Sequence, residues 1–381
     1  MPSTLSLRRR QSGFSLIELM IASVIGLILL GGLSLIFVSS SETNRELQKT
    51  AQQIENGRYA IDTLTQNLRL AGFYGHLYDL STITPVPGTP PDPCELTAAA
   101  LRSALWYPVN AYFGTMGGAA ADVSATSCGA LTADNLQPGS DVLVIRRADT
   151  NVLVAASPKA AGAYYIQSTA YEAQIQVGDA DGTIGACTNS FPCKAEGGDA
   201  DLKLSNGAIP APAAPLRKFQ VHVYFVAPCS IGTNTVGGIA GVCQAGDDTI
   251  PTLKRLELSS DPANTPGQFV IVPLVEGIEL LKVAFGVDTA PTAVNMATGL
   301  SGDAAVDSYT AVEAAPGNWR EVIAARVYVL ARNTEPTRDF KDDKTYTFAG
   351  ASVGPMNDQY KRHVFSAAVR LTNPAGRREI P

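Results

Sequence analysis

The feature that most constrains this 381-residue chain is an apolar run of 25 residues near its N-terminus. The run extends from Phe14 to Val38 and contains one acidic residue, Glu18, and no basic residue. As a helix with a rise of 1.5 Å per residue it would reach roughly 37 Å, which exceeds the ~30 Å hydrocarbon core of a bilayer. The sequence therefore predicts a transmembrane helix over residues 14–38.

The residues before Gly13 are polar and basic and include an arginine cluster at residues 8–10. Basic segments beside a membrane helix tend to stay in the cytoplasm, so the chain after Val38 is expected outside it. A secretory signal fits poorly because its apolar region has only about 7–15 residues. A plain signal anchor is the stronger alternative. However, a carboxylate in lipid costs about 2.5–3.5 kcal/mol, and an anchor gives Glu18 no role that would offset this cost.

The helical pattern continues beyond the membrane run. Apolar residues at helical spacing form a stripe, and its members are Leu47, Ala51, Ile54, Ile61, Leu64 and Leu68. We expect the lower half of the stripe to pack on the chain's own sheet and the upper half to pack on other helices. No proline interrupts residues 14–84, and Gly72 and Gly75 are stop signals. One helix from Phe14 to about Ala71 is predicted, with residues 39–75 as its amphipathic continuation.

Residues 76–381 are predicted to form a β-rich globular head outside the cytoplasm. Runs with strand character occur at 141–147, 151–155, 163–167, 172–177, 219–227, 253–258, 280–287, 322–332 and 363–371. In the run 219–227, large apolar residues alternate with Gln220, His222 and Tyr224, which predicts one apolar and one polar face. Stretches rich in proline or poor in large apolar residues are expected as loops, at 81–93, 206–215 and 288–308. The predicted fold class is α+β, with a long N-terminal α-helix packed on a mostly antiparallel β-sheet head.

The six cysteines fall in sequence-local pairs, which are Cys94 with Cys128, Cys187 with Cys193, and Cys229 with Cys243. An even number of cysteines suits an oxidising compartment, so disulfides are favoured. Six cysteines allow fifteen connectivities, so this nearest-neighbour pairing is an interpretation of spacing alone. A zinc site is a weaker alternative, because the chain has no CxxC pairs and its histidines are scattered.

Charge and motifs argue against several classes of protein. The formal net charge is −6 and no basic patch occurs in the head, so nucleic-acid binding is not expected. His76, His222 and His363 are expected as satisfied surface or rim residues, and no motif supplies a nucleophile with a base. We therefore predict neither an enzyme nor a cofactor.

Acidic segments could in principle hold a hard cation. They lie at 178–183, 197–201 and 246–248, but the first fails the EF-hand pattern because its first ligand position is Val177. Asp and Gly are common turn residues. These segments are expected to be solvated turns, and no metal site is predicted.

The sequence RRRQSGFSLIELMIA at residues 8–22 resembles the type IV prepilin signal, in which a basic leader ends in Gly and is followed by Phe and a nearby Glu. Gly13, Phe14 and Glu18 match this pattern. The resemblance implies that prepilin peptidase cleaves after Gly13, removing residues 1–13 as a leader, and methylates the amine of Phe14. The Glu18 carboxylate would then neutralise the Phe14 amine of a neighbouring subunit, which turns two costly buried charges into one pair.

Stretches farther along the chain are similar to PilW-type minor pilins, at 57–75, 273–288, 326–337 and 360–379. The resemblance implies a minor pilin that takes part in type IV pilus assembly in a priming or tip complex, supporting motility and adhesion. Its partners would be other minor pilins, the major pilin, a tip adhesin and prepilin peptidase. It would span the inner membrane once before assembly and then enter the pilus on the cell surface.

Two other functions remain open at this point. One is the J-type minor pseudopilin of a type II secretion system, which shares the signal and the kind of head. The other is a surface adhesin module on a pilin stalk, which the long loop stretches would allow. Neighbouring genes would distinguish the first of these from a pilus protein.

Overall fold

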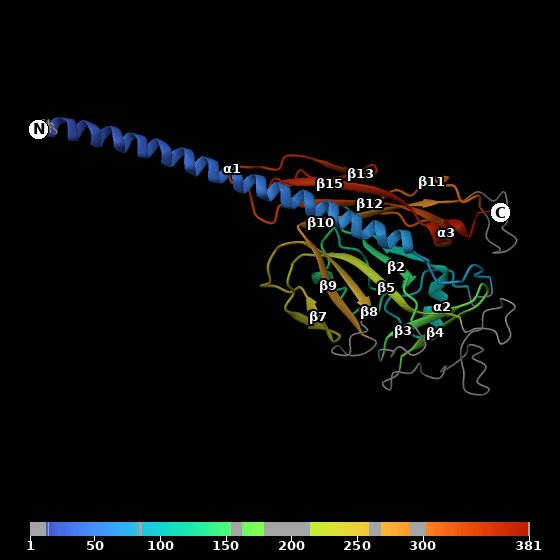
Figure 1. The fold of residues 1–381 in the computed structure, drawn as a ribbon. Coiled ribbons are helices and arrows are strands. Elements are labelled where there is room, and N and C mark those ends of the chain that lie inside the picture. Colours follow the sequence, from blue (N-terminus) through green and yellow to red (C-terminus); the bar gives the residue numbers. More distant parts are fainter. Residues whose placement is uncertain are drawn as a thin grey trace, which may run out of the picture. The chain divides into compact units, whose positions relative to one another are not determined.

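The structure is a computed structural model (Figure 1), and it describes residues 13, 15–81, 83, 86–153, 162–178, 214–258, 268–289 and 302–379. The chain divides into two compact units, Met1–Ala51 and Gln52–Pro381. The boundary between them falls within the first helix. The lower part of that helix therefore belongs to the same unit as the head.

Helix α1 extends from Leu16 to Leu70 and has 55 residues. Its membrane-like first part agrees with the apolar run, and its end agrees with the predicted stop signals. Gly72 and Gly75 both have positive φ angles, of 73° and 79°. Such angles favour glycine, which has no Cβ to clash with the backbone. The predicted long helix is confirmed.

The larger sheet of the head has seven antiparallel strands. Its main path is β1-β2-β5-β3-β4, while β8 pairs with β5 and β9 pairs with β8. The strands are β1 (Val109–Tyr112), β2 (Val142–Ala148), β3 (Tyr164–Ser168), β4 (Ala173–Val177), β5 (Leu216–Ala227), β8 (Thr252–Leu258) and β9 (Phe269–Glu276). Strand β5 is the centre of this sheet, because β2, β3 and β8 all pair with it.

The second sheet has four strands in the order β11-β10-β12-β15. They are β10 (Ile278–Val287), β11 (Ser308–Tyr309), β12 (Val322–Arg332) and β15 (Arg362–Arg370), and every pairing is antiparallel. Two hairpins stand outside these sheets, β6 (Asn234–Val236) with β7 (Ile239–Val242), and β13 (Tyr346–Phe348) with β14 (Ala351–Val353). The predicted α+β class, with its mostly antiparallel sheet, is confirmed.

The remaining described helices are short. They are α2 (Ala98–Ser103), α3 (Thr372–Gly376) and the 3-10 helices η1 (Ala104–Trp106), η2 (Ala133–Asn135) and η3 (Trp319–Glu321). Figure 1 shows that α3 lies near the C-terminal end of α1.

Most predicted strand runs coincide with observed strands. The run 151–155 is an exception: Leu153 makes a single bridge to Leu216, and residues 154–155 lie outside the described part. The sequence missed strands β1, β6, β7, β9, β11, β13 and β14. All of these except β9 are four residues or shorter, and β9 contains Pro273, which disfavours a strand prediction. Pro273 is tolerated because β9 has a single strand partner, β8.

The larger sheet is buried on both faces. Phe219, Val221 and Phe225 of β5 belong to one core cluster. Tyr224 and Val226 point to the other face, into a core that also contains residues of α1 and of the second sheet. The predicted alternation in β5 is therefore correct, but its second face is not exposed to solvent.

Candidate functional site

The start of α1 carries a capping box, in which Ser15 precedes the helix and Glu18 occupies its first turn. The backbone N–H of Ser15 donates to Glu18 Oε2 at 3.1 Å, and the N–H of Leu19 donates to the carbonyl of Ser15 at 3.2 Å. A Ser-x-x-Glu arrangement satisfies backbone donors that a helix start leaves unpaired. The acidic side chain also lies at the end of the helix dipole that favours negative charge. Glu18 thus has a local structural role besides the predicted pairing with an amine.

The predicted cleavage junction lies immediately before this cap. Gly13 is exposed, and a Cβ added to it would meet no atom within 4 Å. Phe14 lies outside the described residues. Cleavage after Gly13 and methylation of Phe14 therefore remain predictions.

The first part of α1 exposes its apolar side chains on all sides. Leu27, Leu35 and Phe37 are 69%, 75% and 75% exposed. Among the described residues, α1 is the one helix that is long and apolar enough to cross a membrane. Such a surface needs lipid or other apolar helices around it.

The lower part of α1 is packed into the head, and small residues on it allow a close approach. Ala60, Leu64 and Leu68 are fully buried in the core between the two sheets. Gly57 lies directly against the ring of Phe365 on β15, because a Cβ on Gly57 would be 2.2 Å from that ring. The prediction that the lower half of the stripe packs on the chain's own sheet is confirmed for Leu64 and Leu68.

The buried face differs in part from the predicted stripe. Leu47 is 62% exposed, whereas Gln53 is 5% exposed. Gln53 Nε2 donates to two backbone carbonyls, Ala331 at 2.8 Å and Lys361 at 2.9 Å. A search for apolar residues at helical spacing passes over a glutamine, although this side chain joins α1 to the second sheet.

The C-terminal end of α1 is capped by residues from the other end of the chain. The Arg377 guanidinium donates to the carbonyl of Gly72 at 2.6 Å, and Asn373 Nδ2 donates to the carbonyl of Ala71 at 3.0 Å. A cation near the last carbonyls of a helix is favourable because these carbonyls carry partial negative charge. Arg377 is 5% exposed, and burial lowers its pKa. The α1 terminus is thus fixed to the segment that follows β15.

A second polar contact holds α1 to the centre of the larger sheet. His222 Nδ1 lies 3.2 Å from Asn67 Oδ1, while Asn67 Nδ2 donates to the carbonyl of Thr63. Since the Asn67 amide nitrogen is already engaged, its oxygen is the acceptor for an Nδ1–H of a neutral imidazole. His222 is 6% exposed, so the prediction of a surface or rim histidine is wrong for this residue. The polar side of β5 is buried because α1 and the second sheet cover it.

The pKa of His222 lies well below its ordinary value, first because of burial and then because of the charges of Arg255 and Arg147. Glu257 is 3.9 Å from the ring, but it is paired with Arg255. The folded protein keeps His222 neutral, whereas the unfolded chain binds a proton on this residue below its pKa of ~6.5. The folded state is therefore fully stable in this respect above pH ~6.5 and is destabilised as the pH falls below that value.

We therefore expect the free energy of unfolding to fall by up to about 1.4 kcal/mol per pH unit as pH decreases from 6.5 towards 5, through His222. A His222→Gln variant, which keeps a hydrogen-bonding group without a titrating one, should show a flatter pH dependence over this range. Urea unfolding at several pH values measures both slopes. Identical slopes in the two proteins would contradict this assignment.

A buried charge network ties the start of β15 to β10 and to the loop before β13. Arg362 makes two contacts with Glu279 and further ion pairs with Asp342 and Asp358. The side chains of Arg362 and Asp342 are 1% and 0% exposed. The Tyr346 hydroxyl donates to Asp342, which completes the network. A cation with three acidic partners is strongly constrained in position.

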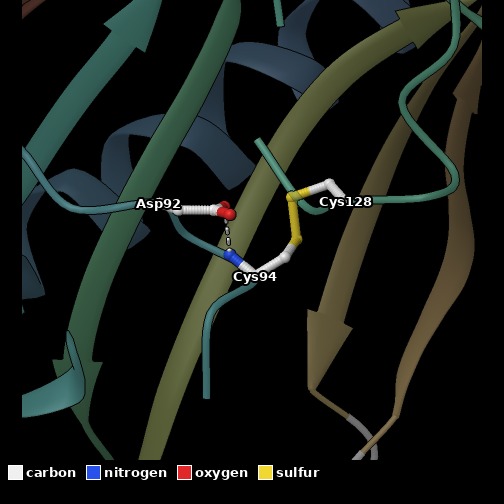
Figure 2. Close-up of side chains that lie close together, drawn as sticks. All are labelled: Asp92, Cys94 and Cys128. Carbon is white, nitrogen blue, oxygen red and sulfur yellow. Dashed lines mark hydrogen bonds between the residues drawn. A yellow bond between two sulfur atoms is a disulfide. The ribbon is translucent and has the colours of Figure 1, made fainter. Parts of the chain in front are cut away.

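Two disulfides form as predicted, Cys94–Cys128 and Cys229–Cys243. Cys187 and Cys193 lie outside the described residues. Asp92 lies beside the first disulfide and accepts the N–H of Cys94 (Figure 2). The Asp92 carboxylate also accepts the N–H of Ser127. The two sulfurs and this carboxylate are close together, but both sulfurs are committed to the disulfide. In this cluster the Asp92 carboxylate stabilises the backbone on both sides of the disulfide, and the sulfurs are not free to bind a metal.

The acidic segment at 246–248 is a turn held by its own carboxylates. Asp247 accepts from Thr233 and Gln244, and Asp248 accepts from Ser230, Ile231 and Ile250. These hydrogen bonds lower the pKa of both groups, that of Asp248 to about 2. The acidic segments at 179–183 and 197–201 lie outside the described residues.

The predicted site residues thus fall in separate places, and the contacts that fix α1 to the head were not predicted. Glu18 marks one end of α1, and the two described disulfides lie in the head. Gln53, Gly57, Asn67 and Arg377 are the residues that sequence reasoning missed. The spacing of Gln53, Gly57, Ala60, Leu64 and Leu68 does follow one helix face, but only for a search that admits polar and small residues.

Profiles of two known protein families match the chain. The prokaryotic N-terminal methylation motif matches residues 8–34. Type IV Pilus-assembly protein W matches residues 233–373, from strand β6 to helix α3. Searches of curated proteins and of solved structures found no match.

A methylation motif at the start of an exposed apolar helix, followed by an antiparallel β-rich head, defines a type IV pilin-like protein. The match over the second half of the head identifies this chain more closely. Over residues 233–373 the head is similar to Type IV Pilus-assembly protein W. The type IV pilin-like resemblance noted from the sequence is confirmed by these two matches.

Proposed function

We propose that this chain is a minor pilin that joins other minor pilins in a priming or tip complex of the type IV pilus. In this role it is a structural, non-catalytic protein held in the inner membrane by α1 before assembly. Its partners are other minor pilins, the major pilin and a tip adhesin, and its assembly supports pilus-dependent motility and adhesion.

The observation that carries the proposal is the placement of Glu18. It is the one acidic residue in the exposed apolar stretch of α1, and it is positioned at the helix start, four residues after the predicted new terminus at Phe14. An exposed apolar helix buries its surface when it packs with other such helices. A carboxylate in that environment is stable only with a partner, and the amine of a neighbouring subunit is a partner of the right charge.

Processing provides the first test. The protein recovered from filaments should begin at Phe14 and carry one methyl group on its amine. Intact-mass measurement together with N-terminal peptide mapping would detect both changes. Filament protein that still begins at Met1 would contradict this prediction.

Assembly provides the second test, and the capping box makes a sharp comparison possible. Glu18→Gln keeps the acceptor that caps Ser15 but removes the charge, whereas Glu18→Ala removes both. If pairing with an amine is the role of Glu18, both variants should insert and be cleaved, and both should enter filaments several-fold less than wild type. The measurement is the amount of each protein in sheared filaments relative to the inner membrane.

The alternatives give different results in the same experiment. A purely local capping role predicts normal incorporation for Glu18→Gln and a defect for Glu18→Ala alone. A tolerated anchor residue predicts equal or better incorporation for both, because a cost of about 2.5–3.5 kcal/mol is removed from the membrane. Either result would contradict the proposal that the charge of Glu18 is needed for assembly.

A further inference from the structure

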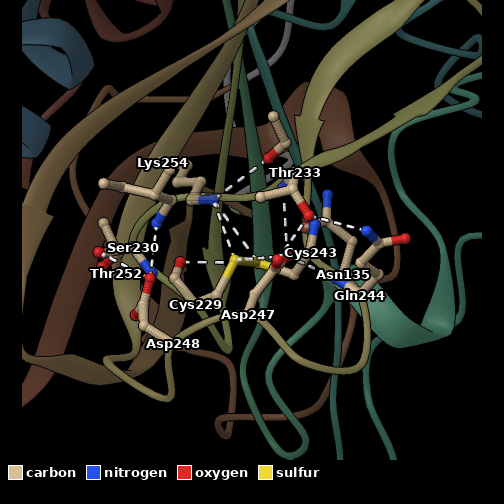
Figure 3. The surroundings of a disulfide bond; sticks show 12 residues. Asn135, Cys229, Ser230, Thr233, Cys243, Gln244, Asp247, Asp248, Thr252 and Lys254 are labelled. Atoms are coloured by element: carbon tan, nitrogen blue, oxygen red, sulfur yellow. Dashed lines mark hydrogen bonds between the residues drawn. A yellow bond between two sulfur atoms is a disulfide. The ribbon is translucent and has the colours of Figure 1, made fainter.

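The disulfide Cys229–Cys243 has a buried lysine beside it. Lys254 Nζ lies 3.7 Å from Cys229 Sγ and 3.6 Å from Cys243 Sγ (Figure 3). The two cysteines enclose the β6–β7 hairpin, and Lys254 belongs to β8. The pairing of β8 with β9 shifts register between Leu253 and Lys254. An irregularity of this kind alters the direction of nearby side chains.

This arrangement is unusual because a disulfide is neutral and needs no counter-ion. Lys254 is 1% exposed, and among the described residues its Nζ donates to the carbonyl of Gly241 at 3.3 Å. Burial lowers the pKa of Lys254, whereas the charges of Asp248 and Asp247 raise it. Those carboxylates are engaged with the surrounding loop, and neither forms an ion pair with Lys254 among the described residues. A buried ammonium without an ion-pair partner is costly, but it is well placed to stabilise an anion.

The other described disulfide differs in its neighbouring charges: Cys229–Cys243 has both Lys254 and Asp247 beside it, whereas a carboxylate lies beside Cys94–Cys128. Cys94 and Cys128 lie beside the carboxylate of Asp92, with the ligand atoms of the three residues within 4.8 Å of one another (Figure 2). A negative charge at this position disfavours a thiolate, whereas a positive charge favours one. The two disulfides should therefore differ in how readily they are reduced.

A small molecule can approach the Cys229–Cys243 pair through a pocket. The pocket has a volume of about 510 Å³, and both cysteines and Asp247 contribute to its lining. Asp134 and Asp248 also line it. The disulfide is thus buried from bulk solvent, and both of its cysteines border this cavity.

We propose that Cys229–Cys243 is a thiol–disulfide exchange site whose substrate is a dithiol reductant, with Lys254 as the counter-ion of the thiolate that reduction releases. This role is separate from assembly through α1.

The chemistry follows from the two neighbours of the sulfurs. A thiolate of the dithiol attacks Cys229 Sγ, the disulfide breaks, and Cys243 leaves as a thiolate beside Lys254. The second thiol of the reductant then attacks the mixed disulfide, which oxidises the reductant and releases Cys229. Cys229 takes up a proton, because Asp247 Oδ2, 4.0 Å from its sulfur, opposes a second negative charge. The dithiol loses two protons and two electrons. The protein gains one thiol and one thiolate, and one proton goes to solvent.

The test compares the two disulfides in one molecule. The full-length chain in detergent micelles is equilibrated with mixtures of reduced and oxidised dithiothreitol at pH 8. The solution is then quenched with acid and alkylated, and peptide masses give the reduced fraction of each pair. Replacing Lys254 with Met removes the charge but keeps a chain of similar length. The Lys254→Met variant should need about tenfold more reduced dithiothreitol to reach half-reduction of Cys229–Cys243, which corresponds to about 30 mV.

Controls separate this effect from a general change in the protein. The midpoint of Cys94–Cys128 should not move in Lys254→Met, and the exposed Lys341→Met should move neither pair. Asp92→Asn should shift Cys94–Cys128 towards easier reduction. Thermal unfolding of the oxidised variants shows whether each one folds. An unchanged Cys229–Cys243 midpoint in a folded Lys254→Met variant would overturn the proposal.

The wild-type protein alone provides an independent test through pH. A lowered thiol pKa makes reduction easier only at pH values above that lowered pKa, because the thiolate forms only there. The advantage grows with pH up to the ordinary thiol pKa of ~8.5, above which any thiol is ionised. The excess of reduced Cys229–Cys243 over Cys94–Cys128 should grow between pH 5 and pH 8. Asp247 and Asp248 have lowered pKa values and stay ionised throughout this range, so they do not add to the change. An excess that does not vary with pH would contradict the role of Lys254.

Discussion

Replacing Arg362 with methionine is expected to lower the free energy of unfolding by about 3–5 kcal/mol. The substitution removes the cation that Asp342 and Asp358 contact, and it leaves Glu279 with its 3.8 Å contact to Arg332. Asp342 is fully buried, so it cannot replace the guanidinium with water. The pKa of Asp358 is held below its ordinary value first by its hydrogen bond to Arg362, and it should rise in the variant.

Urea unfolding of the full-length chain in detergent, followed by tryptophan fluorescence, measures this loss. The matched control is Arg338→Met, because the Arg338 side chain is 88% exposed and its contact with Asp339 is 3.7 Å. Exposed ion pairs contribute little, so the control should change stability by less than about 0.5 kcal/mol. A loss below about 1 kcal/mol for Arg362→Met would show that the network does not depend on its cation.

The second large effect is expected at the contact between α1 and β15. Alanine normally favours a helix over glycine by about 1 kcal/mol. At Gly57, however, the added methyl would lie 2.2 Å from a ring carbon of Phe365, so either the ring or the helix must move. Gly57→Ala should therefore destabilise the head by about 1–3 kcal/mol, as overpacking of a core does.

A double-mutant cycle tests the cause of this loss. In a Phe365→Leu background the smaller side chain leaves room for the methyl, so Gly57→Ala should become neutral or stabilising. Gly317→Ala is a suitable control, because a Cβ there would meet no atom within 4 Å. Additive losses for Gly57→Ala and Phe365→Leu would contradict a direct clash between the two residues.

The long helix and most of the sheet could be predicted because their patterns are local. The apolar run that ends at Val38, the absence of proline and the two glycines after α1 all act over a few residues. Period-two alternation likewise found β5. Alternation could not show whether one face or both faces of the sheet at β5 are covered by other parts of the chain. Strand β5 has apolar neighbours on both sides, and this depends on α1 and on a second sheet formed by residues after 277.

The candidate site shows the same division between local and distant information. Gly13, Phe14 and Glu18 form a compact motif, and Glu18 was recognisable because a carboxylate is out of place in an apolar run. Gln53 and Arg377 carry no such signal. Their partners are backbone carbonyls about 280 to 310 residues away in sequence. Every residue type carries a backbone carbonyl, so the sequence does not mark which one will be the partner. Lys254 was missed for a related reason, because only the folded chain places it beside two cysteines of another segment.

The cap on the C-terminal end of α1 also dictates an order of events. Gly72 is made early, but Arg377, which binds its carbonyl, follows 305 residues later. Asn373 follows Ala71 by 302 residues. A contact this distant in sequence cannot form before its second residue has been made, and the entropy of closing so long a loop slows it further. The chain therefore acquires the finished end of its first helix only after the segment that follows β15 has been made and has folded, so a truncated chain keeps an incomplete helix end.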